Sequence, residues 1–110
     1  MNEEPDKATR ARRDMLTLAA GILGTASQMR DLGAGDGNAL LVGARVEIAS
    51  VAMSPVNADP VVVAASEPER VWVLQTIDDA LAAKGALTGL DPLTWAERQV
   101  QERFKPLVFR

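Results

Sequence analysis

The sequence predicts a small all-α protein, a four-helix bundle with one short extended segment. Apolar residues recur at helical spacing in four stretches of the chain. Aspartate, glycine and proline, which start or stop helices, separate these stretches. Residues 61–65 differ, because their three consecutive valines favour an extended conformation. The alternative is an α+β arrangement with a hairpin at about residues 45–65.

The first helix is expected to begin at a cap, Asp6 or Thr9, and to end near Leu32. Two neighbouring apolar rows run along it, so one side carries an unusually broad apolar stripe that must be covered. The rows are Met15, Leu18, Ile22, Thr25, Met29 and Leu32, and beside them Leu16, Ala19, Leu23 and Ala26. Thr17, Gly21 and Gly24 form a second side of small residues, where another backbone can come close.

The second helix is expected to follow a glycine-rich turn at residues 33–38, which makes a helix hairpin. Asn38 is its predicted cap, and Pro55 is predicted to close it. One side of this helix is apolar and is expected to face the core. That side consists of Leu41, Ala44, Ile48, Val51 and Ala52.

The third and fourth helices each have a start signal. Ser66 and Glu69 are spaced as a capping box, which predicts that the third helix starts there and ends near Gly85. Asp91 and Pro92 offer a cap and a first-turn proline for the fourth helix, which Pro106 is expected to stop. The expected buried sides are Val73, Leu74, Ile77, Ala80 and Leu81 in the third helix, and Leu93, Ala96, Val100 and Phe104 in the fourth.

Length and composition restrict the function. A chain of 110 residues forms one domain, residues 1–110, and its 47% hydrophobic and 25% charged residues are typical of a globular protein. The absence of cysteine and histidine removes thiolate chemistry, the commonest metal ligand and the usual general base. We therefore expect a protein that is not an enzyme and that holds no metal or cofactor. No apolar run is long enough for a stable membrane span.

The acidic residues give little indication of a catalytic or metal-binding site. Asp78 and Asp79 are adjacent on a helix, so their side chains diverge, and Glu67 and Glu69 favour a helix N-terminus. The net charge of −3 predicts no general attraction to nucleic acid. Arg12 and Arg13 lie among acidic residues, so a nucleic-acid-binding regulator is only a further alternative. Alanine is abundant and arginine outnumbers lysine nine to three, which fits a bacterial source.

The N-terminal stretch can also be interpreted as a targeting segment. A charged segment precedes Arg12 and Arg13, and Met15, Leu16 and an uncharged run follow them. This pattern resembles a bacterial twin-arginine export signal. Ala11 stands where such signals usually carry serine or threonine, and Asp31 follows the run closely. The resemblance implies that residues 1–26 are removed and that the protein is a periplasmic accessory subunit of an oxidoreductase, whereas a retained helix implies a cytoplasmic protein.

A contact surface is predicted from large apolar residues that lie outside the apolar stripes of the helices. Trp72 and Trp95 lie off the apolar side of their helices, among polar residues. The chain also ends in the apolar residues Leu107, Val108 and Phe109. Since large aromatic anchors dominate protein interfaces, we expect these five residues to bind a protein partner or a second copy of the chain. The favoured function is therefore a non-catalytic interaction protein, a small subunit or adaptor.

Overall fold

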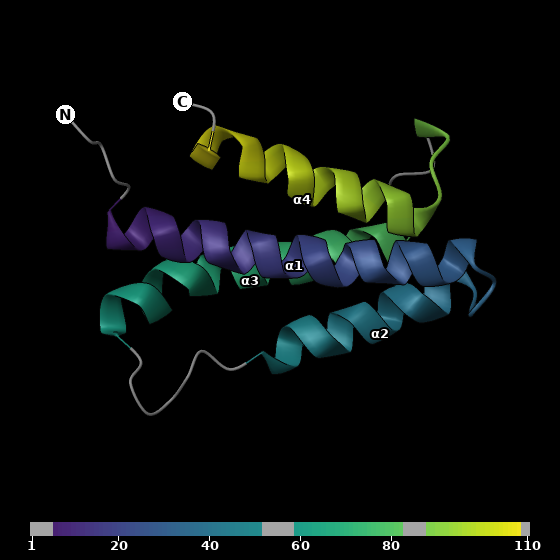
Figure 1. The fold of residues 1–110 in the computed structure, drawn as a ribbon, viewed down its shortest axis with the longest axis horizontal. Helices are drawn as coiled ribbons and strands as arrows, with labels where there is room; N and C mark the ends of the chain where they lie inside the picture. The colour runs from purple at the N-terminus through teal and green to yellow at the C-terminus, as the bar shows by residue number, and fades with distance from the viewer. Residues whose placement is uncertain (1–5, 52–58, 83–87, 109–110) are drawn as a thin grey trace.

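The computed structural model describes residues 6–51, 59–82 and 88–108. These residues form four α-helices and no strand: α1 (Lys7–Asp31), α2 (Gly37–Ser50), α3 (Pro60–Leu81) and α4 (Pro92–Val108). Successive helices run in opposite directions, so α1 and α3 point one way and α2 and α4 the other (Figure 1). The predicted all-α four-helix bundle is confirmed.

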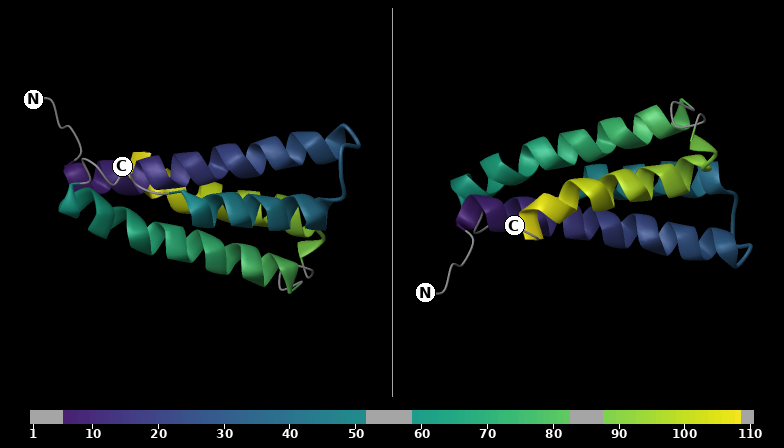
Figure 2. Two further views of the ribbon diagram at one scale, coloured as in Figure 1. Left: turned by 90° about the horizontal axis from the view of Figure 1, so that it is seen from below. Right: turned by 90° about the horizontal axis from the view of Figure 1, so that it is seen from above.

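Helix α1 lies at the centre of the bundle and packs against all three other helices. In Figure 1, α4 lies above it, α2 below it and α3 behind it. The two views of Figure 2 show the same arrangement from the other sides. The central place of α1 follows from its broad apolar stripe, since a single neighbour covers only part of such a surface.

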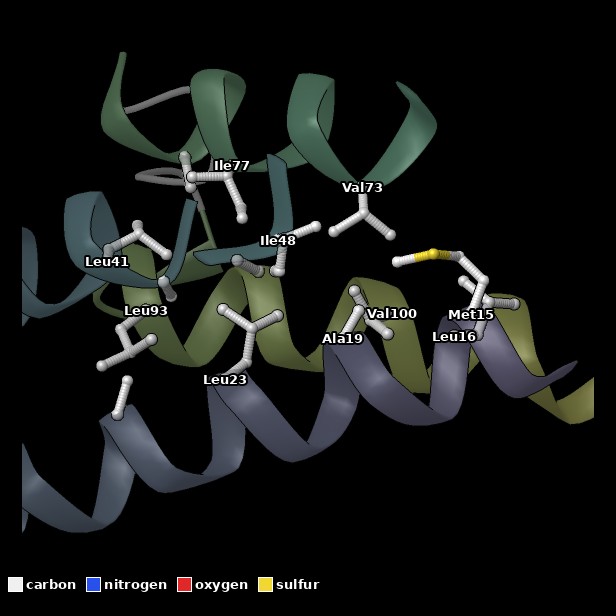
Figure 3. Close-up of a cluster of buried hydrophobic side chains, with 14 of the residues drawn as sticks. Met15, Leu16, Ala19, Leu23, Leu41, Ile48, Val73, Ile77, Leu93 and Val100 are labelled. Atoms are coloured by element: carbon white, nitrogen blue, oxygen red, sulfur yellow. The ribbon is translucent and has the colours of Figure 1, made fainter. Parts of the chain in front are cut away.

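The core consists of apolar side chains from all four helices that point toward one another (Figure 3). Helix α1 contributes mainly its second row, because Leu16, Ala19 and Leu23 have no exposed surface. The sides predicted for the other helices are also buried at most of their positions. These buried residues are Leu41, Ala44 and Ile48 in α2, Val73, Ile77 and Ala80 in α3, and Leu93, Ala96 and Val100 in α4.

Each helix starts at an aspartate whose carboxylate accepts a hydrogen bond from a backbone amide of the first turn. Asp6 accepts from the amide of Thr9 at 2.7 Å. The other three acceptors are Asp36, Asp59 and Asp91, at 2.7–3.1 Å from the amides of Ala39, Val61 and Thr94. These bonds satisfy amides that have no partner within the helix. For α2 the cap is therefore Asp36, and the predicted cap Asn38 is wrong.

The extended segment predicted at residues 61–65 is wrong, because these residues form the first turns of α3. Asp59 caps this helix and Pro60 occupies its first turn, where a missing amide N–H costs nothing. Each valine costs only a few tenths of a kcal/mol in a helix, so the start signal outweighs the β-branched run. The alternative hairpin at residues 45–65 is wrong for the same reason, since its described parts belong to α2 and α3.

The predicted capping box at Ser66 and Glu69 is also wrong as a helix start. Both residues lie inside α3 and are 2% exposed, and Pro68 between them is an internal proline. The hydroxyl of Ser66 donates instead to the carbonyl of Val63, one turn earlier. Glu69 does not turn back on its own helix but bonds to arginines of α1 and α4.

The remaining predicted helix ends have mixed outcomes. Pro106 does not stop α4, which continues to Val108. The C-cap of α1 is Leu32, and Gly33 follows with a φ of +77°, as a turn between two helices requires. The predicted terminators Pro55 and Gly85 lie outside the described residues.

Candidate docking groove

An apolar groove of about 590 Å³ runs along the surface between α1 and α2. It is open to solvent, and the two antiparallel helices form its walls. We call it the α1/α2 groove. Its lining residues are Thr17, Leu18, Gly21, Ile22, Thr25, Ala26 and Met29 from α1, and Ala39, Leu40, Gly43, Ala44 and Glu47 from α2.

The groove exists because the apolar stripe of α1 is wider than the core needs. The second row enters the core, and the first row, apart from Met15, is left at its edge. Leu18 and Met29 are each 40% exposed, although both belong to a regular apolar row. The outer half of the stripe therefore faces the groove without a covering element among the described residues.

Two glycines keep the groove deep. A Cβ atom added to Gly21 or to Gly43 meets nothing within 4 Å, so each glycine leaves open space above its backbone. Gly24 differs, because a Cβ there lies 3.5 Å from Oε2 of Glu97 on α4. The side of small residues predicted on α1 is thus divided, with Thr17 and Gly21 in the groove and Gly24 against α4.

Among the described residues that line the groove, Glu47 is the single ionisable one. Its carboxylate forms no ion pair with the described residues, and the residue is exposed. The hydroxyl of Thr25 donates internally to the carbonyl of Gly21 at 3.0 Å. The surface that the groove offers is therefore mostly apolar, with the hydroxyl of Thr17 on the α1 side and the carboxylate of Glu47 on the α2 side.

The outer side of α2 continues this apolar surface. Val42 and Val46, one helical turn apart, are 48% and 61% exposed. Only three residues of α2 are buried, although most of its residues are apolar. Arg45, the only basic residue of α2, points the other way and forms two hydrogen bonds to Asp78 of α3, at 2.6 and 3.0 Å. A helix that is apolar on nearly every side usually has contacts on every side.

A second apolar hollow, of about 360 Å³, lies between α1 and α4. Thr17, Ala20, Gln101, Phe104 and Lys105 line it. It is smaller than the α1/α2 groove, and Lys105 at its edge already pairs with Glu102 at 3.0 Å.

Of the described residues predicted as a contact surface, Trp72 and Leu107 line a common hollow of about 410 Å³, and Trp95 is not among its lining residues. Trp72 and Trp95 are half-buried and pack against the core. The guanidinium of Arg103 lies over the Trp72 ring, 4.5 Å from its centroid. Leu107 belongs to the core and is 8% exposed, and its role in binding a partner stays a prediction. Phe109 and the side chain of Val108 lie outside the described residues.

The residues that resemble an export signal have structural contacts in the bundle. Met15 and Leu16 are buried in the core, at 3% and 0% exposure. The Nε of Arg12 donates to Oε1 of Glu69 on α3 at 2.9 Å. Arg13 is half-buried, without an ion pair to the described residues.

Glu69 is the one strongly buried carboxylate of the described residues, and two arginines hold it. Arg12 of α1 binds one carboxylate oxygen, and Arg103 of α4 binds the other at 2.5 Å. Burial raises the pKa of Glu69, but the hydrogen bonds from Arg103 and Arg12 lower it more, so the pKa lies below the ordinary 4.5. Since the carboxylate is fully bonded within the protein, it is a structural link and not a free acid or base.

The paired acidic residues of the sequence are likewise engaged. Asp78 pairs with Arg45, whose hydrogen bond lowers the pKa of Asp78, and Asp79 accepts a hydrogen bond from Gln75 at 3.0 Å. Glu67 pairs with Arg70 of its own helix at 2.6 Å. Within the described ranges, no three acidic side chains come together in a metal-binding arrangement.

No helix in the described part of the chain is both long and apolar enough to cross a membrane. Comparisons of the chain with protein-family models, with curated proteins and with solved structures found no match. The α1/α2 groove must therefore be interpreted from its own geometry. The sequence predicts its components, the first row of α1 and the small residues, and a need to cover the broad stripe, but not which part of the stripe the other helices leave exposed.

Proposed function

We propose that the protein is a non-catalytic interaction protein and that the α1/α2 groove is its docking surface. One observation carries this proposal: half of the apolar stripe of the central helix remains outside the core, directly beside the two open glycines Gly21 and Gly43. Exposed apolar surface in a contiguous, concave patch commonly marks a site of protein–protein contact.

The shape and chemistry of the groove suit an α-helix better than a small molecule. Sites for small molecules usually combine an apolar lining with several convergent polar groups that fix orientation. Here Glu47 is the single charged residue of the lining, and the hydroxyl of Thr25 is used internally. An amphipathic helix needs only an apolar groove for its apolar side, and glycines in the groove let its backbone come close.

A groove-filling variant tests the proposal. Gly43→Leu places a side chain in the open space and also removes a helical glycine, which gains about 1 kcal/mol of helix propensity. We therefore expect Gly43→Leu to melt no lower than the parent and yet to lose its docking partner. Gly43→Ala is the matched control, because it makes the same propensity change but adds only one methyl group.

The measurement combines self-association by sedimentation with capture of proteins from an extract of the native source. The proposal expects the parent and Gly43→Ala to bind the same polypeptide, another copy or a different chain, and Gly43→Leu to bind at least tenfold more weakly. If all three proteins bind and sediment alike, the groove is not a docking surface.

We also propose that residues 7–26 are retained in the functional protein. Removal of residues 1–26 takes Met15, Leu16 and Leu23 out of the core, together with the Arg12 contact to Glu69. The exported accessory subunit and the nucleic-acid-binding regulator gain no support of their own, since Arg12, Arg45 and Arg103 are all engaged by carboxylates within the bundle.

A further inference from the structure

We infer that the occupant of the α1/α2 groove is α2 of a second copy of this chain, in a two-fold symmetric, antiparallel dimer. This inference rests on the docking function proposed above and names the partner. Each copy inserts the ridge formed by Val42 and Val46 into the groove of the other.

The first argument is that ridge and groove lie side by side on one helix. Val42 and Val46 are four residues apart, so they form a continuous ridge on the outer side of α2. Gly43 and Ala39, next to that ridge, line the groove. A two-fold rotation about an axis near Gly43 therefore places each ridge in the other groove, so that one surface serves both partners.

The second argument is electrostatic. Within the described residues, the groove and ridge carry one ionisable group, Glu47, and the basic residue of α2, Arg45, is turned away toward Asp78. In an antiparallel pair centred on Gly43, each Glu47 lies about 6 Å along the helix from the axis, so the two carboxylates are roughly 12 Å apart along the helices. That distance exceeds the screening length of about 8 Å at physiological salt, so their repulsion is weak.

The same arrangement places Glu47 opposite Ala39 of the second copy, in the first turn of its α2. The carboxylate of Asp36 already accepts from the amide of Ala39 in its own chain at 3.1 Å, so this position adds no attraction for Glu47. A parallel pairing, by contrast, brings the two Glu47 side chains together, so the antiparallel pairing is the one that keeps these like charges apart.

The third argument is area. Half of the curved surface of a 14-residue helix about 10 Å wide is about 330 Å². Each copy also covers about a quarter of the surface of α1 along residues 17–29, roughly 150 Å², so the dimer covers on the order of 1,000 Å² in total. Specific interfaces need roughly 1,000 Å² or more, so this contact reaches the lower limit for a specific dimer.

Sedimentation of the full chain tests the inference. We expect a dimer for the parent and a dissociation constant at least tenfold higher for Gly43→Leu, which fills the groove, and for Val46→Glu, which puts a charge on the ridge. Val71→Glu is the matched control, because Val71 is 57% exposed on α3, away from the groove, and this variant should remain a dimer. Circular dichroism should show the same helix content in all four proteins.

Cross-linking tests the antiparallel geometry, and the absence of native cysteine makes it specific. Gly43→Cys lies near the two-fold axis and should form a disulfide-linked dimer under mild oxidation, whereas Val71→Cys should not. Efficient cross-linking of a mixture of Ala39→Cys and Glu47→Cys, but of neither alone, also supports the antiparallel pairing.

Three outcomes overturn the inference. A parent that stays monomeric at its highest soluble concentration excludes the dimer. The docking function survives in that case if the parent binds a different polypeptide and Gly43→Leu does not. A dimer that neither Gly43→Leu nor Val46→Glu weakens uses another surface, and both the inference and the docking function then fail. A dimer weakened by both variants but cross-linked equally at Gly43→Cys and Val71→Cys has a different geometry.

Discussion

Arg12 on α1 donates a 2.9 Å hydrogen bond from its Nε to Oε1 of Glu69 on α3, and this bond joins two helices that are far apart in sequence. Arg103 of α4 completes the cluster from the other side. The same carboxylate thus links three of the four helices at one end of the bundle. Arg12, which resembles part of an export signal in the sequence, thus forms an ion pair with Glu69 in the folded protein.

Glu69→Ala is expected to destabilise the fold by about 1–3 kcal/mol, because two charge-assisted hydrogen bonds to a buried carboxylate are lost. Arg12 and Arg103 are partly exposed and regain water, which limits the loss. Glu102→Ala is the matched control, since that exposed residue pairs with the exposed Lys105 and the change should alter stability by less than about 0.5 kcal/mol. Urea denaturation measures both, and equal midpoints for the two variants contradict the structural role of Glu69.

Acid should weaken the fold through Glu69. Its folded pKa is below the ordinary 4.5, so the unfolded chain takes up a proton first as the pH falls. The stability that Glu69 contributes is fully present well above pH 4.5 and is lost as the pH falls toward and through the folded pKa. Urea midpoints measured between pH 7 and pH 3 should fall less steeply for Glu69→Gln than for the parent. Parallel curves for the two proteins exclude this contribution.

The two apolar rows of α1 should differ sharply in their contribution to stability. Leu16 has no exposed surface, so Leu16→Ala leaves a cavity and should cost about 2–5 kcal/mol. Leu18 is 40% exposed in the groove, so Leu18→Ala should cost no more than about 1 kcal/mol in the monomer. Thermal unfolding at low protein concentration compares the two directly. A comparable loss for both means that the groove side of α1 is covered in the folded monomer.

Trp95 stays a predicted contact residue, and its variant separates a role in packing from a role in binding. Trp95 packs against the core, so Trp95→Ala should lower the melting temperature by several degrees. If Trp95 also anchors a partner, association should weaken by about 2 kcal/mol at a temperature where the variant is fully folded. Unchanged association under those conditions assigns Trp95 to packing alone.

Replacement of Arg12 and Arg13 by lysine tests the export resemblance. Lysine keeps the positive charge next to Glu69 but does not reproduce the guanidinium, so the double variant should fold with only a small loss of stability. If residues 7–26 are retained, the variant and the parent should be found in the same compartment, and peptides from these residues should be recovered from the mature protein. A variant that accumulates as an unexported precursor supports the signal instead.

The sequence predicted the bundle because the apolar rows with the clearest helical period are also the rows that pack in the core. The rows that contain Leu41, Val73 and Leu93 have the helical period and enter the core as expected. The start of α4 was predicted from Asp91 and Pro92, and the same aspartate–proline pair at Asp59 and Pro60 marks the start of α3. Sequence patterns alone missed this second signal, because the three valines that follow it favour an extended conformation.

Other features depend on tertiary contacts that no local pattern contains. Ser66 and Glu69 have the spacing of a capping box, but Glu69 bonds to residues 57 positions before it and 34 after it. In α1, periodicity alone gives the width of the apolar stripe and not how much of it the neighbouring helices cover. The groove is therefore visible only once α2 and α4 are placed around α1.

The Glu69 cluster also has a topological consequence. Arg12 near the start of α1 and Arg103 near the end of α4 meet on one carboxylate, so the two ends of the helical chain lie at the same end of the bundle (Figure 1). A short linker between them is then compatible with the native packing. The order of the helices along the chain is thus not fixed by the fold, and a circular permutant that begins with α3 and ends with α2 retains every helix–helix interface.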